Sequence, residues 1–147
     1  MYIMMRSFSG IKPEEQWYMN SLCHRRKGPA LKRNKKKRWF LLGYEYIFTK
    51  TNCGAETHLV LFHGALSSFN DLPSVVYQNG TKEWHLCGKL HRVDGPAVEY
   101  SNGDKEYWYL NQRHNAFGPA VILGDKEYWY NWGNFQKFEK RESNVSI

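Results

Sequence analysis

Six histidines are the residues of this 147-residue chain best suited to chemistry, because imidazole transfers protons near neutral pH and binds metal ions. They are His24, His58, His63, His85, His91 and His114. Cys87 lies four residues before His91, and Cys23 adjoins His24, but neither pair has the second pair of ligands that a four-coordinate zinc site needs. The sequence also has no Gly-rich phosphate loop, no nucleophile elbow and no paired-carboxylate helix. We therefore expect no metal, no cofactor and no enzymatic activity.

Basic residues are the second feature that could do chemistry, since Lys and Arg side chains bind phosphates and carboxylates. Residues 1–50 hold 12 Lys and Arg residues against 3 acidic ones, whereas residues 51–147 hold 9 against 11, so the net charge of +7 is concentrated near the N-terminus. We define the basic cluster as Arg25, Arg26, Lys27, Lys32, Arg33, Lys35, Lys36, Lys37 and Arg38. Nucleic acid, an acidic protein surface and a merely solvated edge are three open interpretations of this cluster. No base-reading motif accompanies it, so sequence-specific recognition of nucleic acid is not expected.

Three of the histidines belong to a repeated phrase. In His24–Ala30, His91–Ala97 and His114–Ala120, a histidine is followed four residues later by Gly-Pro-Ala, and Asn70–Ser74 is an eroded copy. The prolines of the last three copies stand 23 residues apart, at positions 73, 96 and 119, and a fixed period of this length marks a stacked array. Each repeated histidine is therefore expected to hydrogen-bond its own loop. Asp94 is expected to accept backbone N–H groups within its Asp-Gly-Pro turn.

Each repeat also carries the pattern of a β-hairpin. The runs 75–77 and 82–86 flank Asn79-Gly80, and the runs 97–100 and 105–109 flank Asn102-Gly103. Asn and Gly tolerate the positive φ that both central residues of a type I′ turn require, so type I′ turns and an exposed turn tip for residues 34–37 of the basic cluster are predicted. In the last unit Gly124 follows two residues early, which predicts a shorter hairpin.

The N-terminal half carries worn copies of the unit. Trp17 lies 7 residues before His24 and 12 before Pro29, and Trp84 has the same spacing to the next histidine and proline. A degenerate unit is expected between residues 43 and 64, with strands at 44–48 and 59–62. The two Phe residues of segment 135–142 are three apart, which is compatible with a short helix against the last repeat.

The phrase from Gly88 to Ala97, together with Trp17–Asn20 and the His-Arg and Gly-Pro-Ala steps, resembles the W-Y-x-N-G-K-x-H-R-x-D-G-P-A variant of MORN-type repeats. These repeats are abundant in tailed phages and large DNA viruses. The resemblance covers most of residues 15–133 and implies a stack of hairpins with a structural or binding role in a virus-encoded protein. The chain departs from the pattern at 115–117 and 73–74, so those loops are expected to be the least regular.

These patterns predict a mostly β fold of stacked antiparallel β-hairpin repeats that form an elongated, twisted and partly rolled sheet. Residues 1–142 are expected to form a single domain of about five units with a basic N-terminal tip, and residues 143–147 a C-terminal tail. The residues expected to be structural in the repeat are Trp17, His24, Trp84, His91, Asp94, Pro96, Trp108, His114, Pro119 and Trp129. Most aromatic residues are expected to join one hairpin to the next rather than to stack on a ligand.

Composition limits the location and the function. No run approaches the roughly 20 apolar residues of a transmembrane helix, no signal peptide is recognisable, and three cysteines without paired spacing favour a reducing compartment. We expect a non-enzymatic, virus-encoded module for protein binding or structural assembly, in the host cytoplasm or the virion. The alternative is a sequence-independent nucleic-acid-binding protein that uses the basic cluster, for example to inhibit host defence. The partner, viral or host, and the oligomeric state stay open.

Overall fold

The computed structural model describes residues 2–7, 14–26, 28–33, 36–49 and 56–142, and these contain strands, turns and loops but no helix. The first strands are β1 (Tyr2–Ser7), β2 (Glu14–Met19), β3 (Leu22–Cys23), β4 (Leu31–Arg33), β5 (Lys36–Leu41), β6 (Tyr44–Thr49), β7 (Glu56–Phe62) and β8 (Ala65–Leu66). They are followed by β9 (Val75–Tyr77), β10 (Lys82–Glu83), β11 (His85–Leu86), β12 (Lys89–Leu90), β13 (Val98–Glu99), β14 (Lys105–Glu106), β15 (Trp108–Tyr109), β16 (Gln112–Arg113), β17 (Val121–Leu123), β18 (Lys126–Asn131) and β19 (Asn134–Lys140). The predicted tail, residues 143–147, lies outside the described residues.

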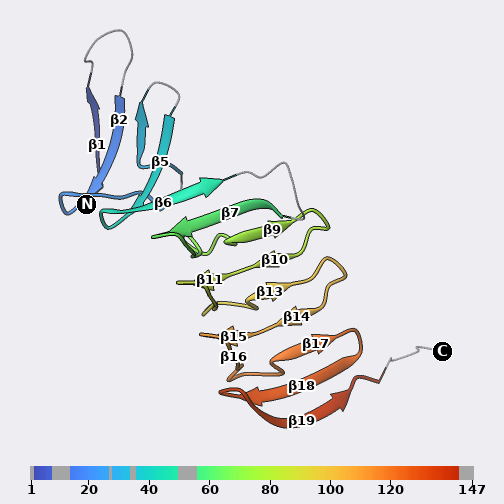
Figure 1. The fold of residues 1–147 in the computed structure, drawn as a ribbon. Helices are drawn as coiled ribbons and strands as arrows, with labels where there is room; N and C mark the ends of the chain where they lie inside the picture. The colour runs from blue at the N-terminus through green and yellow to red at the C-terminus, as the bar shows by residue number, and fades with distance from the viewer. Residues whose placement is uncertain (1, 8–13, 27, 34–35, 50–55, 143–147) are drawn as a thin grey trace.

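The strands pair in chain order, as the repeat pattern predicts. The hydrogen-bonded order is β1-β2-β4-β5-β6-β7-β9-β10-β13-β14-β17-β18-β19, and every pairing in it is antiparallel. Two short ladders, β11–β12 and β15–β16, stand beside this path. Successive hairpins descend the elongated molecule without closing into a barrel (Figure 1). The prediction of an all-β array of stacked hairpins is therefore confirmed.

The Asn-Gly turns have a different geometry from the predicted one. The N–H of Gly80 donates to the carbonyl of Tyr77 at 3.0 Å, the N–H of Tyr77 donates to the carbonyl of Thr81 at 2.9 Å, and only the glycine has positive φ, +90°. This is a type I turn followed by a left-handed glycine, a three-residue hairpin loop. Asn79 contributes its side chain, because its Oδ1 accepts the N–H of Thr81 at 2.9 Å. The type I′ prediction was wrong here, and Asn102-Gly103 repeats the same bonds.

Type I′ geometry occurs instead on the opposite side of the array (Figure 1). Two successive residues have positive φ between β2 and β3, β5 and β6, β7 and β8, β11 and β12, β15 and β16, and β18 and β19. We define the turn edge as these six turns, at residues 20–21, 42–43, 63–64, 87–88, 110–111 and 132–133. The units whose Asn-Gly turns the structure describes, at 78–80 and 101–103, therefore have a wide turn on one side and a tight turn on the other. The last wide turn is reduced to Gly124-Asp125, which confirms the shorter final hairpin.

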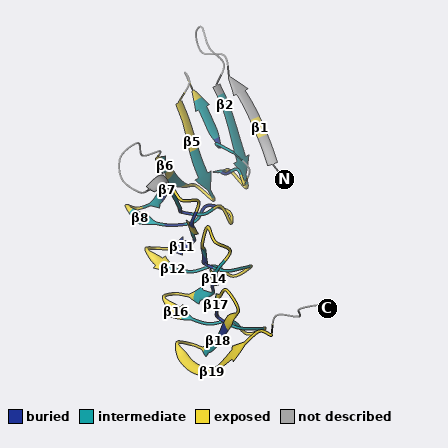
Figure 2. Ribbon diagram, turned by 90° about the vertical axis from the view of Figure 1, so that its right-hand side faces the viewer, coloured by how far each residue is buried: buried dark blue, intermediate teal, exposed yellow. Residues whose placement is uncertain are grey.

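The core is a thin line along the array, made mainly of alanines and valines with Phe69 and Trp84 (Figure 2). The alanine of each Gly-Pro-Ala phrase is completely buried, at Ala30, Ala97 and Ala120, and Ser74 takes this place in the eroded copy. The N–H of Trp84 donates to the carbonyl of Ala97 at 2.8 Å, so this position is inside the stack, and its complete burial leaves room only for a small side chain. This packing explains the repeated Pro-Ala and Pro-Ser steps.

The expected C-terminal helix is a strand. Phe138 pairs with Tyr128 and Phe135 with Tyr130, and the register shifts between Trp129 and Tyr130. The two tyrosines are two residues apart on one face of β18, so the extra residue of the bulge brings two Phe residues three apart onto the matching face. The spacing that suggested a helical period is therefore produced by a β-bulge. No helix that could cross a membrane occurs among the described residues.

Candidate functional site: latched turns and the basic cluster

The repeated histidines hold the turn edge together. His24 Nδ1 accepts the N–H of Leu42 at 2.8 Å, and His114 Nδ1 accepts the N–H of Trp132 at 3.4 Å. In the degenerate unit Ser67 takes the place of the histidine, and its Oγ accepts the N–H of Cys87 at 2.9 Å. Each acceptor lies one unit before the turn that it binds, so the expectation that these histidines serve their own loop was wrong. We refer to these contacts as latches between successive units.

Backbone bonds reinforce every latch. The second residue of each turn donates its N–H to the carbonyl of the residue just before the latching position, one unit earlier. The pairs are Gly43 to Cys23, Gly88 to Leu66, Asn111 to Leu90 and Gly133 to Arg113, at 2.7–3.0 Å. A side-chain acceptor and a backbone acceptor thus bind adjacent N–H groups of one turn, which fixes the turn against the preceding unit.

His91 departs from this pattern. Its Nδ1 is buried and makes no hydrogen bond within the described residues, and the link to the next unit is made by Asn111, whose Oδ1 accepts the N–H of Leu90 at 2.7 Å. The His91 ring instead packs edge-on against Tyr109 at 4.5 Å, and Tyr109 packs against Trp132 at 5.3 Å. His114 stacks on Trp132 at 4.1 Å. An aromatic ladder therefore runs along the C-terminal part of the turn edge.

Burial favours the neutral form of three histidines. Desolvation lowers the pKa of His24, His85 and His91 below the ordinary value of 6.5, and the charge of Arg26 adds to the effect at His24. A latch needs an unprotonated Nδ1, because a protonated nitrogen cannot accept the N–H of the turn. Hydrogen bonding and burial therefore favour the same neutral form.

Bulky apolar residues occupy strained positions of the turn edge. Leu42, Leu110 and Trp132 are the first central residues of their turns, with φ of +50°, +49° and +47°. Their side chains are 49%, 40% and 50% exposed. Left-handed backbone is unfavourable for such residues, and about half of each side chain remains in contact with water, so burial offsets the strain only in part. These residues were not predicted from the sequence, although Gly43, Asn111 and Gly133, which follow them, recur at about one or three repeat lengths and are a usable signal.

The Gly-Pro loops are closed by the residue after the histidine. Arg25 Nη1 donates to the carbonyl of Pro29 at 3.2 Å, and Arg92 Nη1 donates to that of Pro96 at 3.2 Å. In the third copy Asn115 Nδ2 donates to the carbonyl of Pro119 at 2.9 Å, so the departure from the motif at 115–117 preserves the bond. Asp94 is exposed, and its side chain makes no hydrogen bond within the part of the chain that the structure describes. The predicted role of its carboxylate was therefore wrong.

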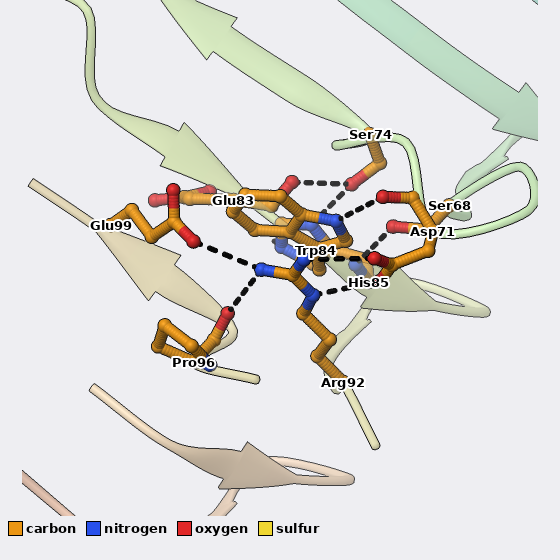
Figure 3. Close-up of polar contacts among 9 residues, drawn as sticks. All are labelled: Ser68, Asp71, Ser74, Glu83, Trp84, His85, Arg92, Pro96 and Glu99. Carbon is orange, nitrogen blue, oxygen red and sulfur yellow. Dashed lines mark hydrogen bonds and ion pairs between the residues drawn. The ribbon is translucent and has the colours of Figure 1, made fainter. Parts of the chain in front are cut away.

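Figure 3 shows how Arg92 joins two units. Its guanidinium donates to both carboxylate oxygens of Asp71, at 2.7 and 2.9 Å, and to Glu99 at 3.0 Å. It also lies 3.8 Å from the centre of the Trp84 ring, whose Nε1 donates to the carbonyl of Asp71 at 2.9 Å. The other repeat tryptophans likewise carry a cation over the ring: Trp17 with Arg25 at 4.0 Å, Trp108 with Arg113 at 4.7 Å and Trp129 with Lys137 at 4.3 Å.

Ser74, His85 and Glu83 contain the residue types of a hydrolytic triad (Figure 3). Ser74 Oγ lies 2.7 Å from His85 Nδ1, and His85 Nε2 lies 3.7 Å from Glu83. Ser74 is completely buried, so no substrate can reach its hydroxyl. Ser74 Oγ also donates to the carbonyl of Glu83 at 3.2 Å, which makes the group a cross-strand polar link rather than a reactive site. Within the described residues, no group of three or more His, Cys, Asp or Glu side chains could hold a metal ion.

The basic cluster is only partly available to a ligand. Arg25 is held over Trp17, Lys32 pairs with Glu15 at 3.1 Å, and Arg38 binds both carboxylate oxygens of Glu45 at 2.6 Å. The hydrogen bond from Arg38 lowers the pKa of Glu45 below its ordinary value. Lys27 and Lys35 lie outside the described residues. Exposed side chains without an ion pair in the described structure remain at Arg26, Lys36 and Lys37.

The position of the cluster also differs from the predicted turn tip. Lys36, Lys37 and Arg38 lie on β5, because Arg33 pairs with Lys36 and Leu31 with Arg38 in the ladder to β4. The basic side chains are therefore spread over two neighbouring strands, and alternate residues of each strand face opposite sides of the sheet. A ligand on one face can meet only part of the cluster.

Comparison with family models, curated proteins and solved structures found no match for this chain. The resemblance to MORN-type repeats stays a prediction based on the sequence motif.

Proposed function

We propose that this protein is a non-enzymatic repeat module that binds a protein partner along its turn edge. The observation that carries the proposal is the exposure of Leu42, Leu110 and Trp132 at left-handed positions of latched turns. Strain that recurs at exposed positions is characteristic of binding sites, where contact with a partner offsets its cost. Trp is among the residue types that most often supply the binding energy of protein interfaces, and burial of apolar surface such as that of the two leucines favours association.

The architecture supports an extended partner surface. The latches fix each turn against the preceding unit, so little conformational entropy is lost when a partner contacts several turns at once. The aromatic ladder of Tyr109, Trp132 and His114 adds rigid rings to the same edge. A partner that presents apolar side chains at the spacing of the units matches this edge best.

The MORN-type resemblance extends the proposal to a viral setting, either as a minor virion component or as a factor directed at a host protein. Two experiments together distinguish these roles: mass spectrometry of purified virions, and affinity capture of partners from infected cells. A virion component is found in stoichiometric amounts in the particles. A host-directed factor is absent from them and retains a specific host protein.

Replacing Leu42, Leu110 and Trp132 together by Asn tests the binding surface. Asn tolerates left-handed backbone, which offsets part of the loss of the Trp132 contacts with His114 and Tyr109, so the variant is expected to stay folded, while capture of partners found with the wild type falls at least about tenfold. Phe117→Asn is the matched control, because Phe117 is completely exposed but lies in a Gly-Pro loop. Unchanged capture by the triple variant, or equal loss in the control, contradicts the assignment of the turn edge.

A second candidate function rests on Arg26, Lys36 and Lys37, which are exposed and have no ion pair in the described structure. Each Lys or Arg that neutralises a phosphate releases a condensed counterion, so these residues favour binding of nucleic acid without sequence preference. The ion pairs of Lys32 and Arg38 compete with this activity. Protein binding is therefore the function that the structure supports better, and nucleic-acid binding is the second candidate.

Neutralising Arg26, Lys36 and Lys37 tests this second function. Wild-type binding to single-stranded or duplex DNA and RNA is expected to weaken steeply with salt, with a slope of about −0.7 to −0.9 per phosphate contacted, and the triple Ala variant should have a shallower slope. Fluorescence anisotropy over a salt series measures both. Absence of wild-type binding at about 50 mM salt rejects the function.

A further inference from the structure

The outer edge of β19 is open. Among the described strands β19 pairs only with β18, and all seven of its residues are exposed. It forms the last rung of the stack (Figure 1). An open edge presents N–H and C=O groups that can pair with a strand of another chain.

One hydrogen bond identifies which groups point outward. The N–H of Arg141 donates to the carbonyl of Asp125 at 2.7 Å, and Lys140 is opposite Lys126 in the register of β18 and β19. Backbone groups alternate in direction along an antiparallel strand, so those of Phe138 and Lys140 point away from β18. Phe138 is therefore a natural centre for pairing with a second strand.

The side chains of this segment are complementary to themselves. If two copies of β19 pair antiparallel with Phe138 opposite Phe138, Lys137 of each copy is opposite Glu139 of the other. Shifting the register by two residues in one direction places Glu139 opposite Glu139, and in the other direction Lys137 opposite Lys137. Opposite charges across a ladder stabilise it and like charges destabilise it, so charge selects the register centred on Phe138.

We infer that this protein forms a symmetric dimer by pairing the β19 edges of two copies. The axis passes beside Phe138, and the two arrays continue one another across the new ladder. Lysines commonly protect an edge against such pairing, but here each Lys137 meets a carboxylate of the other copy. Because one short strand of each copy forms the contact, the dimer belongs to the small, concentration-dependent class of interfaces.

A charge-swap series tests the dimer by sedimentation velocity at low salt, from about 10 μM to 1 mM protein. We expect the wild type to move from 17.4 kDa toward twice that mass as concentration rises. Lys137→Glu should lower the association constant at least about tenfold, and the double variant Lys137→Glu/Glu139→Lys should restore it. Lys89→Glu, at the exposed residue of β12, is the control and should associate as the wild type does.

Phe138→Pro tests the backbone pairing separately. Its N–H is not used within the hairpin, so proline should abolish the dimer while the protein stays folded, whereas Phe138→Ala should retain the pairing N–H and part of the association. A wild type that is monomeric throughout, an unaffected Lys137→Glu variant, or a double variant that stays dissociated overturns the inference. Open-ended growth beyond two copies also overturns it, because that requires a different, head-to-tail contact.

Discussion

Trp84→Ala is expected to lower the free energy of unfolding by about 3–5 kcal/mol. Trp84 is 4% exposed, its ring lies under the guanidinium of Arg92, and its Nε1 donates to the carbonyl of Asp71. Truncation leaves a cavity, an unpaired carbonyl and an arginine without its aromatic support. Urea titration followed by circular dichroism measures the change.

Trp84→Phe provides the matched comparison, because it retains a ring beneath Arg92 and removes the indole N–H. A loss of about 1–2 kcal/mol is expected, close to the cost of one buried hydrogen bond plus a small cavity. It also keeps the test decisive if the alanine variant does not fold. A Trp84→Ala protein within about 1 kcal/mol of the wild type would contradict the role of this residue in joining units.

Acidification is expected to produce the second large effect. The pKa values of His24, His85 and His91 are lowered from 6.5 by burial, so the unfolded chain takes up protons first as the pH falls. Stability therefore rises with pH in this window. The neutral histidines contribute fully to the free energy of unfolding above pH 6.5. This contribution is lost progressively as the pH falls from 6.5 to the lowered pKa values of the folded state. Urea titrations between about pH 7.5 and 5 measure the slope before most carboxylates titrate.

His24→Asn is the control for this slope. Asn Oδ1 can accept the N–H of Leu42 without titrating, so the variant should retain a latch and depend less on pH. If the free energy of unfolding of this variant depends on pH as steeply as that of the wild type, His24 does not contribute to the pH dependence. Stability that increases on acidification would contradict the neutral form of all three histidines.

The strands were predictable because the pattern that forms them is local. Val75 and Val76 alternate between the two faces of a strand and pair with Glu83 and Lys82 across an Asn-Gly turn, as the repeat register predicted. The turn type was not predictable from Asn79-Gly80 alone, because Asn also suits a type I turn followed by a left-handed Gly. The turn type depends on which two residues form the final hydrogen-bonded pair of the hairpin, here Tyr77 and Thr81.

The turn edge was less predictable, because tertiary contacts override local preference there. Nothing intrinsic to Leu42 or Trp132 favours positive φ, and the latches from the preceding unit hold these residues in place. The availability of the basic cluster to a ligand was also not predictable from the sequence. The basic residues can be counted in the sequence, but their ion-pair partners cannot be read from it. Glu15 pairs with Lys32 and Glu45 with Arg38 only because neighbouring strands bring these side chains together.

The most direct test of the latches compares two backbone amides by hydrogen exchange and NMR. The N–H of Leu42 is bound by an imidazole that titrates, whereas the N–H of Cys87 is bound by the hydroxyl of Ser67, which does not. After correction for intrinsic rates, protection of Leu42 is expected to fall about tenfold or more between pH 7.5 and 5, while that of Cys87 changes little. Equal responses of the two amides, or an unprotected Leu42 at neutral pH, would contradict the account of units joined by side-chain latches.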